Sequence, residues 1–279
     1  MNISAIIVVF NPKLTELLKH ISTYKFFVSQ IVIVDNSNDL LIKGKVETLC
    51  LNNRFDYIDM KGNKGIASAL NVGFNYVIKG GADWILTMDQ DSYFVSNFDG
   101  FKAYLQYGNI SNLLLLAPIY SNHESLCTSS DKITYPKIVI QSGNLVNAFS
   151  YIKLGPYRED FFIDFVDYEY CLRGISNKMT ISQIHSVILK HSPGENSIGN
   201  FLGLKYNYWS SVPIRYYYVI RNGLLTAFLY RQFWCIGIVI KTIFRVILLE
   251  KCKKVKLFYI YKGFADFLLS KYGKFSESI

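Results

Sequence analysis

Unbroken apolar runs that alternate with amphipathic segments constrain the fold of this chain more than any other feature. Residues 3–10 form a continuous apolar run, as expected of a parallel strand that is buried on both faces. Residues 14–24 then carry apolar side chains at helical spacing, and further strands are predicted at 31–34, 57–58 and 84–88. This order predicts an α/β fold with a Rossmann-like, mostly parallel, doubly wound sheet and helices on both of its faces.

Polar side chains follow the second strand of this series. Asp35 and Asn36 come directly after residues 31–34, and in open α/β sheets ligands bind at the C-terminal ends of the strands. The Asp35 carboxylate could accept a hydrogen bond from a nucleobase or a ribose, and Asn36 adds a donor and an acceptor. The run Asp-Asn-Ser-Asn is also good turn chemistry, so a plain turn is the alternative.

Two carboxylates, Asp89 and Asp91, follow the last of these strands, with Gln90 between them. Carboxylate oxygens suit a hard cation, Mg²⁺ or Mn²⁺, which takes its other ligands from waters and substrate phosphates. His191 ends a predicted strand at 184–190, and an imidazole there could complete a metal site begun by Asp91. An ordinary loop is the alternative for the aspartates, and a polar residue at a strand end is the alternative for His191.

A glycine-flanked loop, residues 62–65, precedes a predicted helix at 66–77. The first N–H groups of that helix and its positive dipole end favour a phosphate, which makes Asn63 and Lys64 candidate substrate contacts. A plain helix entry explains the same residues.

Two further candidate substrate contacts lie elsewhere in the predicted sheet domain. Asn71 lies inside the helix at 66–77, either as a substrate contact or as a packing position, with Gly73 allowing close contact between helix and sheet. Gly143 lies in the break of a strand pair predicted between residues 138 and 147.

An acidic and aromatic segment, residues 161–173, is predicted to be helical. Acids among aromatic side chains are costly to bury unless they have partners or a function. Asp164 and Asp167 are three residues apart and are predicted to share one helix face, with Asp167 as a general base. For Glu169 we favour a helix-terminus interaction and an ion pair with Arg173, four residues on.

Arginines and tyrosines gather near residue 220. Arg215 and Arg221 could pair with a diphosphate, and the tyrosines between them could stack on a sugar. The alternative is an amphipathic helix whose arginines reach out to solvent.

From residue 223 to residue 279 the chain is apolar, aromatic and basic. Its uncharged stretches fall short of the ~20 residues that a membrane-spanning helix needs. We therefore expect a catalytic domain over residues 1–222 and a tail of amphipathic helices over 223–279, lying on a membrane surface or packing on protein. The net charge of +9 is interleaved with aliphatic residues, which speaks against nucleic-acid binding. Five cysteines without a CxxC pair, and a start without a basic leader, indicate a cytoplasmic protein with no signal peptide.

In combination, these motifs resemble those of family 2 glycosyltransferases. The matching segments are Val34-Asp35-Asn36-Ser37, Gly62 to Gly73, Leu86 to Ser92, Phe162 to Arg173, and His191. The Asp-Gln-Asp-Ser and Asp-x-Val-Asp-x-Glu signatures are closest to those of bacterial rhamnosyltransferases. The spacing from Asp167 to His191 is similar to that of galactofuranosyltransferases.

This resemblance implies a GT-A fold, a divalent metal and an inverting mechanism. By the same resemblance, Asp35 would contact the base, Asp89 the ribose side, Asp91 and His191 the metal, and Asp167 would be the catalytic base. Gln90 stands where such families often have an acid, which leaves Asp91 as the main metal carboxylate.

The function that the resemblance implies is sugar transfer from dTDP-rhamnose to a polyprenyl-diphosphate-linked glycan. It would take place at the cytoplasmic face of the bacterial inner membrane, during O-antigen or capsule assembly, with the protein bound peripherally and its oligomeric state open. A galactofuranosyltransferase or another UDP-hexosyltransferase is the nearest alternative. A nucleotidyltransferase would want a glycine-rich basic loop after the first strand, and a non-catalytic binding module would not need Asp91, Asp167 and His191 together.

Overall fold

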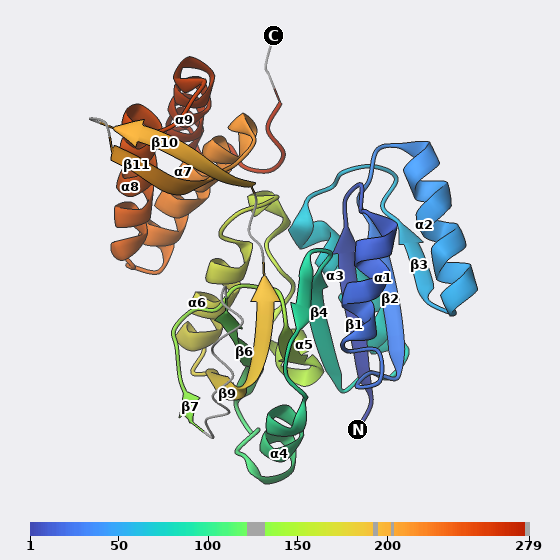
Figure 1. The fold of residues 1–279 in the computed structure, drawn as a ribbon. Coiled ribbons are helices and arrows are strands. Elements are labelled where there is room, and N and C mark those ends of the chain that lie inside the picture. Colours follow the sequence, from blue (N-terminus) through green and yellow to red (C-terminus); the bar gives the residue numbers. More distant parts are fainter. Residues whose placement is uncertain (122–131, 192–194, 202–203, 277–279) are drawn as a thin grey trace. The chain divides into compact units, whose positions relative to one another are not determined.

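A computed structural model describes residues 1–121, 132–191, 195–201 and 204–276, and gives the backbone alone between 195 and 210. The chain, drawn in Figure 1, divides into two compact units. The sheet unit comprises Met1–Tyr157 and Tyr170–Ser192. The helical unit comprises Arg158–Glu169 and Pro193–Ile279.

The sheet unit contains a mixed sheet with the strand order β3-β2-β1-β4-β8-β6-β9-β5, and β7 pairs with β9. The first four strands run parallel, whereas β8 is antiparallel to both of its neighbours. The strands are β1 Ile3–Val9, β2 Gln30–Asp35, β3 Asp56–Asp59, β4 Trp84–Asp89, β5 Ser92–Phe94, β6 Leu113–Ser121, β7 Ile133–Thr134, β8 Asn144–Asn147 and β9 Thr180–His191. The helices named with this unit are α1 Leu14–Ser22, α2 Leu40–Asn53, α3 Ile66–Lys79, α4 Asp99–Tyr107, α5 Ala148–Leu154 and α6 Val166–Ser176, of which α6 begins in the helical unit.

Helices cover both faces of this sheet, because alternate side chains of a strand point to opposite faces. In β1, Ala5 and Ile7 belong to a core cluster that includes Leu17 of α1 and Val46 of α2. Ile6 points the other way, toward α3, where a Cβ on Gly73 would lie 2.7 Å from the Ile6 side chain. The close approach at Gly73 and the doubly wound arrangement are as the sequence predicts.

The register of the parallel strands places their acidic ends along one edge of the sheet. Val9 at the end of β1 pairs with Asp35, and Asp35 pairs with Asp59. On the other side of β1, Val8 pairs with Asp89. This edge therefore carries a row of carboxylates at the ends of β2, β3 and β4.

The helical unit contains a hairpin and a group of three helices. Strands β10 Glu195–Phe201 and β11 Leu204–Ser210 pair antiparallel. Helices α7 Pro213–Leu229, α8 Trp234–Leu248 and α9 Lys253–Leu268 share a cluster of buried side chains. A short 3-10 helix, η1 Glu159–Phe161, precedes α6 in this unit. No helix in the described part of the chain combines the length and the apolarity needed to cross a bilayer.

Several predicted boundaries differ from the structure. Residues 138–141 form no strand, and β8 begins only at Asn144. The helix predicted over 161–173 begins at Val166, because Phe162, Asp164 and Phe165 have φ angles of 62°, 59° and 63°, outside the right-handed helical region.

The division of the chain also differs from the predicted boundary at residue 222. Residues 158–169 pack with the C-terminal part of the chain, as does all of α7. Helix α7 shares its buried side chains with α8 and α9, so a cut at residue 222 would pass through that cluster.

Candidate functional site

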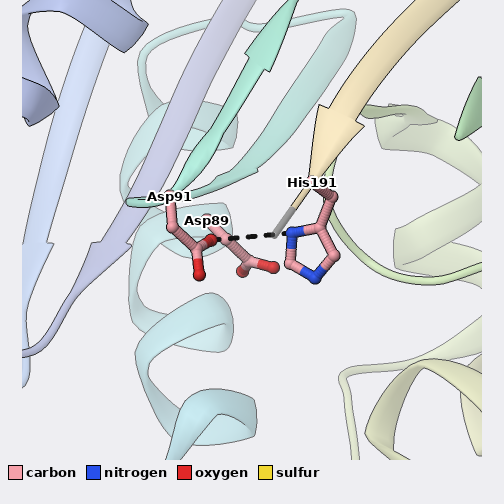
Figure 2. Close-up of side chains that lie close together, drawn as sticks. All are labelled: Asp89, Asp91 and His191. Atoms are coloured by element: carbon pink, nitrogen blue, oxygen red, sulfur yellow. Dashed lines mark ion pairs between the residues drawn. The ribbon is translucent and has the colours of Figure 1, made fainter. Parts of the chain in front are cut away.

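Asp89, Asp91 and His191 come together in the sheet unit, as Figure 2 shows. One ligand atom from each residue lies within 4.8 Å of the other two, and Asp91 Oδ1 is 3.6 Å from His191 Nδ1. The two aspartates belong to the end of β4 and the turn after it, whereas His191 ends β9. The sequence predicted Asp91 and His191 as metal ligands, with Asp89 on the ribose side, and the structure places all three side by side.

Strand pairing explains how a histidine so distant in the sequence reaches the aspartates. The short strand β5 follows Asp91 directly and pairs antiparallel with β9, so that Ser92 lies opposite His191. The Ser92 hydroxyl is 2.8 Å from His191 Nδ1 and holds the imidazole ring. At the end of β4, the Asp89 N–H donates to the buried Ser142 hydroxyl at 3.0 Å.

The geometry of this group fits a divalent cation. Ligand atoms about 2.1 Å from an octahedral ion lie about 3 Å apart when adjacent and about 4 Å apart when opposite. The upper limit of 4.8 Å within the group needs only a small closure to reach these values. Two carboxylates and one imidazole suit Mn²⁺. The two carboxylates also suit Mg²⁺, which prefers oxygen ligands.

Gln90, which lies between the two aspartates in the sequence, has a defined structural role. Its side-chain oxygen accepts from the Phe10 N–H at 2.8 Å, and its Nε2 donates to the Phe10 carbonyl at 3.3 Å. The Gln90 carbonyl lies 2.9 Å from His20 Nδ1. An amide can donate and accept at once and a carboxylate cannot. Gln90 thus joins the Asp89–Asp91 turn to the end of β1.

Asp35 and Asn36 are buried at the end of β2. The Asp35 carboxylate accepts from the Ser37 N–H at 2.8 Å and from the Tyr57 hydroxyl at 3.2 Å. Burial, together with the charge of Asp35, raises the pKa of Tyr57 well above its usual range, so the hydroxyl stays a donor. Asn36 bridges two backbone groups, donating to the Gly65 carbonyl and accepting from the Lys64 N–H.

The loop before α3 is tied to the residues after β2 in a second place. The Asn63 N–H donates to Asn38 Oδ1 at 3.0 Å, and Asn63 Oδ1 in turn accepts from the Gly65 N–H at 3.0 Å. With Asn36, these bonds fasten the predicted phosphate loop to the β2 end. The roles of Asn63 and Lys64 toward substrate stay predictions.

Asn71 and Gly143 have structural roles that the sequence left open. Asn71 is buried in α3, where its amide donates to the Tyr157 carbonyl and accepts from the Tyr157 N–H and the Tyr151 hydroxyl. Gly143 has a φ of 83°, and its N–H donates to the Thr87 carbonyl at 2.7 Å. A Cβ at this position would lie 2.9 Å from Leu189 and Pro118. Both residues therefore have structural roles, because their polar groups are occupied by contacts within the protein.

In the helical unit, Asp164 does not share a helix face with Asp167, which corrects the prediction. Asp164 precedes α6 and has a left-handed backbone, so the helical spacing does not apply to it. Both of its oxygens accept from the guanidinium of Arg215, and the Arg215 Nε contact measures 3.1 Å. The two residues predicted as substrate contacts thus form a fork-like ion pair with one another.

Asp167 and Glu169 occupy the first turn of α6. Asp167 is half-buried and accepts from the Tyr168 N–H at 2.9 Å. Glu169 is fully buried and accepts from the Tyr230 hydroxyl at 2.6 Å. The ion pair predicted between Glu169 and Arg173 stays a prediction, whereas Tyr230, which directly follows α7, is a long-range partner that no local pattern shows.

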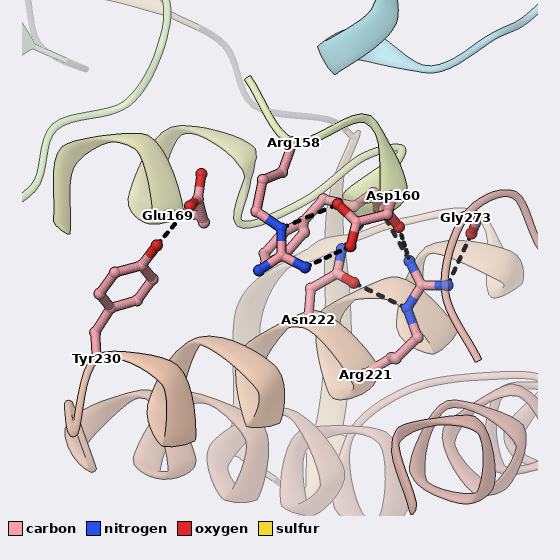
Figure 3. Close-up of polar contacts among 8 residues, drawn as sticks. Arg158, Asp160, Glu169, Arg221, Asn222, Tyr230 and Gly273 are labelled. Carbon is pink, nitrogen blue, oxygen red and sulfur yellow. Dashed lines mark hydrogen bonds and ion pairs between the residues drawn. The ribbon is translucent and has the colours of Figure 1, made fainter. Parts of the chain in front are cut away.

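Arg221 is fully buried and holds the backbone instead of a ligand, which removes it from the substrate contacts predicted from the sequence (Figure 3). Its guanidinium donates to the carbonyls of Asp160 at 2.9 Å and Gly273 at 2.7 Å. Asn222, which accepts from Arg221 Nε, donates through Nδ2 to the carbonyls of Phe161, Ile163 and Asp164 at 2.8–2.9 Å. The pair fixes the loop that contains the left-handed residues before α6.

The sequence missed the supporting residues Ser92, Ser142 and Asn222. Each makes its contact across a long stretch of chain, between β5 and β9, between the 142 turn and β4, or between α7 and the loop before α6. Of these three residues, Ser92 is the one with a sequence signal, because it directly follows Asp91.

Comparison with known proteins gives a consistent assignment. Residues 4–99 match the model of glycosyl transferase family 2. Over 242 residues, which cover 80% of this chain and 79% of the relative, the chain is 28% identical to the dTDP-rhamnosyl transferase RfbF of Shigella flexneri.

Two solved structures are similar in fold. The mannosyltransferase PcManGT from Pyrobaculum calidifontis, in complex with GDP-Man and Mn²⁺, matches with a TM-score of 0.62 at 9% identity, over 97% of this chain and 88% of that one. GalNAc-T7 with UDP, GalNAc and Mn²⁺ matches with a TM-score of 0.56 at 12% identity, over 68% of this chain. The match spans less than half, 44%, of the GalNAc-T7 chain. Residues 4–99 thus match glycosyl transferase family 2, and the chain has a GT-A-like fold.

Proposed function

We propose that this glycosyltransferase moves L-rhamnose from dTDP-rhamnose to a hydroxyl of a glycan acceptor, with inversion at the anomeric carbon. The observation that carries a metal-dependent transfer is the group of Asp89, Asp91 and His191 at the ligand-binding edge of the sheet. The name of the Shigella relative supports rhamnose, at 28% identity. Transfer from a UDP-hexose, such as UDP-galactofuranose, is the second candidate.

Asp91 and His191 would hold the cation, with Asp89 beside them toward the ribose. Mn²⁺ is present in both solved neighbours described above, and the oxygen and nitrogen ligands of this chain suit it. When bound, the cation would stabilise the negative charge of the departing nucleoside diphosphate. Asp35 and Asn36 would face the nucleoside, and Asn63 and Lys64 the diphosphate.

Asp167 would take the proton from the acceptor hydroxyl as that oxygen attacks the sugar. Inverting transfer needs one such base and no carboxylate nucleophile. Asp164 is less suited to this task, because the guanidinium of Arg215 occupies both of its oxygens. Arg215 would accordingly hold Asp164 in place.

The acceptor would be a polyprenyl-diphosphate-linked glycan at the cytoplasmic face of the bacterial inner membrane, during O-antigen or capsule assembly. The helical unit supports a peripheral attachment, since it combines exposed apolar side chains with a basic charge.

A donor screen tests the proposed reaction. The purified chain would be incubated with dTDP-rhamnose, UDP-galactofuranose, UDP-GlcNAc and GDP-mannose, each with and without Mn²⁺, and the release of nucleoside diphosphate would be measured. We expect slow, Mn²⁺-dependent hydrolysis of dTDP-rhamnose above that of the other donors. Preferred hydrolysis of a UDP-sugar would mean that this sugar nucleotide, not dTDP-rhamnose, is the donor. Equal release of nucleoside diphosphate by the wild-type chain and the Asp91→Asn variant would reject the proposed metal site.

A further inference from the structure

Helix α8 has an apolar face that the helical unit does not cover. Cys235, Val239 and Val246 point into the unit and are buried. On another side of the same helix, Ile240, Phe244 and Ile247 are exposed, Phe244 to 58%. Exposing a row of large apolar side chains costs free energy in water unless a partner covers it.

Helix α9 repeats this arrangement. Leu257, Tyr261, Phe264 and Leu268 recur at the spacing of one helix face and are all exposed, Tyr261 to 66% and Leu268 to 65%. The seven exposed residues of the two helices, defined here as the α8–α9 face, are Ile240, Phe244, Ile247, Leu257, Tyr261, Phe264 and Leu268.

An apolar groove of about 390 Å³ joins the two rows. Ile240 of α8 and Tyr261 and Phe264 of α9 line it, together with buried side chains of α7 such as Leu224. Because exposed residues of both helices border one groove, the two rows meet in a single surface.

The charges of this region are strongly one-sided. Between residues 231 and 274 the acids are Glu250 and Asp266. Glu250 is buried between Arg245 and Lys256, and Asp266 accepts from the Tyr217 hydroxyl at 2.8 Å. The basic residues of the same stretch are Arg231, Lys241, Arg245, Lys251, Lys253, Lys254, Lys256, Lys262, Lys271 and Lys274.

We propose that the α8–α9 face docks on the surface of an anionic phospholipid bilayer, with an acyl chain in its groove. Exposed apolar side chains would enter the boundary between headgroups and acyl chains, while the lysines beside them would contact the lipid phosphates. This inference deepens the proposed function, since a lipid-linked acceptor would be held in the same surface.

The charge distribution favours lipid over a second copy of the chain. Two copies that met through this face would bring lysine-rich surfaces together, and like charges across an interface oppose association. An anionic bilayer satisfies the apolar and the basic side chains at once.

Sedimentation with vesicles of phosphatidylglycerol or phosphatidylcholine tests the proposal with the full chain. We expect binding to phosphatidylglycerol that is at least tenfold stronger than to phosphatidylcholine and is partly released by high salt. The double variant Phe244→Ser/Phe264→Ser should weaken binding on the order of tenfold or more, because buried aromatic surface is lost. Lys251→Glu/Lys254→Glu should weaken it by a similar factor, since each basic residue near an anionic surface contributes roughly fivefold.

Matched control variants in the sheet unit distinguish a specific effect of the α8–α9 face from a general effect of lost apolar surface or changed net charge. Phe26→Ser/Phe149→Ser removes two phenylalanines that are 90% and 71% exposed, and should leave binding within twofold. Lys19→Glu/Lys79→Glu makes the same change in net charge and should also have a small effect.

Three outcomes would overturn the proposal. These are failure of the wild-type chain to bind phosphatidylglycerol, equal losses in the α8–α9 and control variants, and a Phe244→Ser/Phe264→Ser variant that binds vesicles normally. If that variant also lowers the mass measured by sedimentation velocity without lipid, the face joins two copies instead. Donor hydrolysis, measured in parallel without vesicles, should be the same in all variants. A chain that binds lipid but hydrolyses no donor would reject the proposed function and leave the docking face intact.

Discussion

Two aspartates three residues apart, Asp164 and Asp167, have different surroundings in the helical unit. Asp164 faces the Arg215 guanidinium with both oxygens, whereas Asp167 lies in the first turn of α6 and is half-buried. A base needs an oxygen that can receive a proton, and a guanidinium fork occupies those positions. Asp167 is therefore the proposed base, whereas Asp164 forms an ion pair with Arg215.

Asp167→Asn should lower kcat by a factor on the order of 10² to 10⁴ and leave nucleotide affinity nearly unchanged, as expected when a positioned base is lost. Steady-state kinetics and calorimetric titration with dTDP measure the two quantities. Asp164→Asn is the matched control, and it should lower thermal stability more than Asp167→Asn does, because Arg215 loses its charged partner. A mild Asp167→Asn beside an inactive but folded Asp164→Asn would reverse the assignment.

Asn222 shows how one buried side chain can hold a loop with an unfavourable backbone. Its Nδ2 donates to three carbonyls of residues 161–164, where two non-glycine residues, Phe162 and Asp164, have positive φ angles. Asn222→Ala should lower the free energy of unfolding by about 2–4 kcal/mol, since each buried carbonyl left without a donor costs about 1–3 kcal/mol. Asn222→Asp should be at least as destabilising, because a carboxylate would face carbonyl oxygens.

Urea denaturation followed by circular dichroism measures these changes. The exposed Asn52 of α2 provides the control, and Asn52→Ala should change stability by less than about 0.5 kcal/mol. Equal, small effects at both positions would show that the loop is stable without Asn222.

At the level of elements, the packing of α3 on the sheet depends on Gly73. A Cβ at this position would lie 2.7 Å from Ile6 Cγ2 and 3.2 Å from Val34 Cγ2, whereas Gly44 in α2 has open space around it. Gly73→Ala should destabilise the chain by about 1–3 kcal/mol through overpacking. Gly44→Ala should instead stabilise it by about 0.5–1 kcal/mol, because alanine restricts the unfolded chain and favours helix.

Thermal unfolding of both variants checks the sign of each change. Opposite shifts of the melting temperature are expected for the two glycines. A stabilising Gly73→Ala would mean that α3 can move away from β1 and β2 without loss.

The C-terminal segment after α9 is part of the helical unit, not a removable tail. The Gly273 N–H donates to the Asp160 carbonyl at 2.7 Å, and the Phe275 N–H donates to the Tyr218 hydroxyl at 2.8 Å. The sequence left open whether the tail over residues 223–279 lies on a membrane surface or packs on protein. The structure predicts that ending the chain after Lys271 already destabilises the helical unit and lowers transfer activity.

Limited proteolysis of the chain that ends after Lys271 tests whether the helical unit is destabilised. We expect faster cleavage within residues 158–169 and 213–268 than in the full chain, with β1–β4 equally protected in both. Unchanged cleavage and full activity would show that Gly273 and Phe275 add nothing to the stability of the unit.

The elements that the sequence predicted are those with a strong local pattern. Strands β1, β2 and β4 match the predicted strands to within one residue at each end, because both faces of these strands are buried and give continuous apolar runs. Helix α2 was missed because its exposed residues include Leu40, Leu41 and Leu51, which remove the amphipathic pattern. The hairpin of β10 and β11 lacks an apolar run and gave no signal.

At the scale of the whole molecule, the parallel topology made the row of strand-end carboxylates predictable. Carboxyl ends of parallel strands share an edge, so Asp35, Asp89 and Asp91 could be placed together from their positions after strands. Arg221 could not be assigned in this way, because its partners Asp160 and Gly273 lie far from it in the sequence. The division into two units was equally hidden, since residues 158–169 join a unit that otherwise begins after β9.

The most direct test of a metal-dependent transferase is the affinity of the chain for Mn²⁺ in the presence of dTDP, measured by the electron paramagnetic resonance signal of free Mn²⁺. We predict that the wild-type chain binds one Mn²⁺ and that Asp91→Asn and His191→Gln each weaken this affinity at least tenfold, while Asp167→Asn does not. Transfer from dTDP-rhamnose should stop in EDTA and return with added Mn²⁺. Equal Mn²⁺ affinity in all four proteins, together with full transfer in EDTA, would contradict the account.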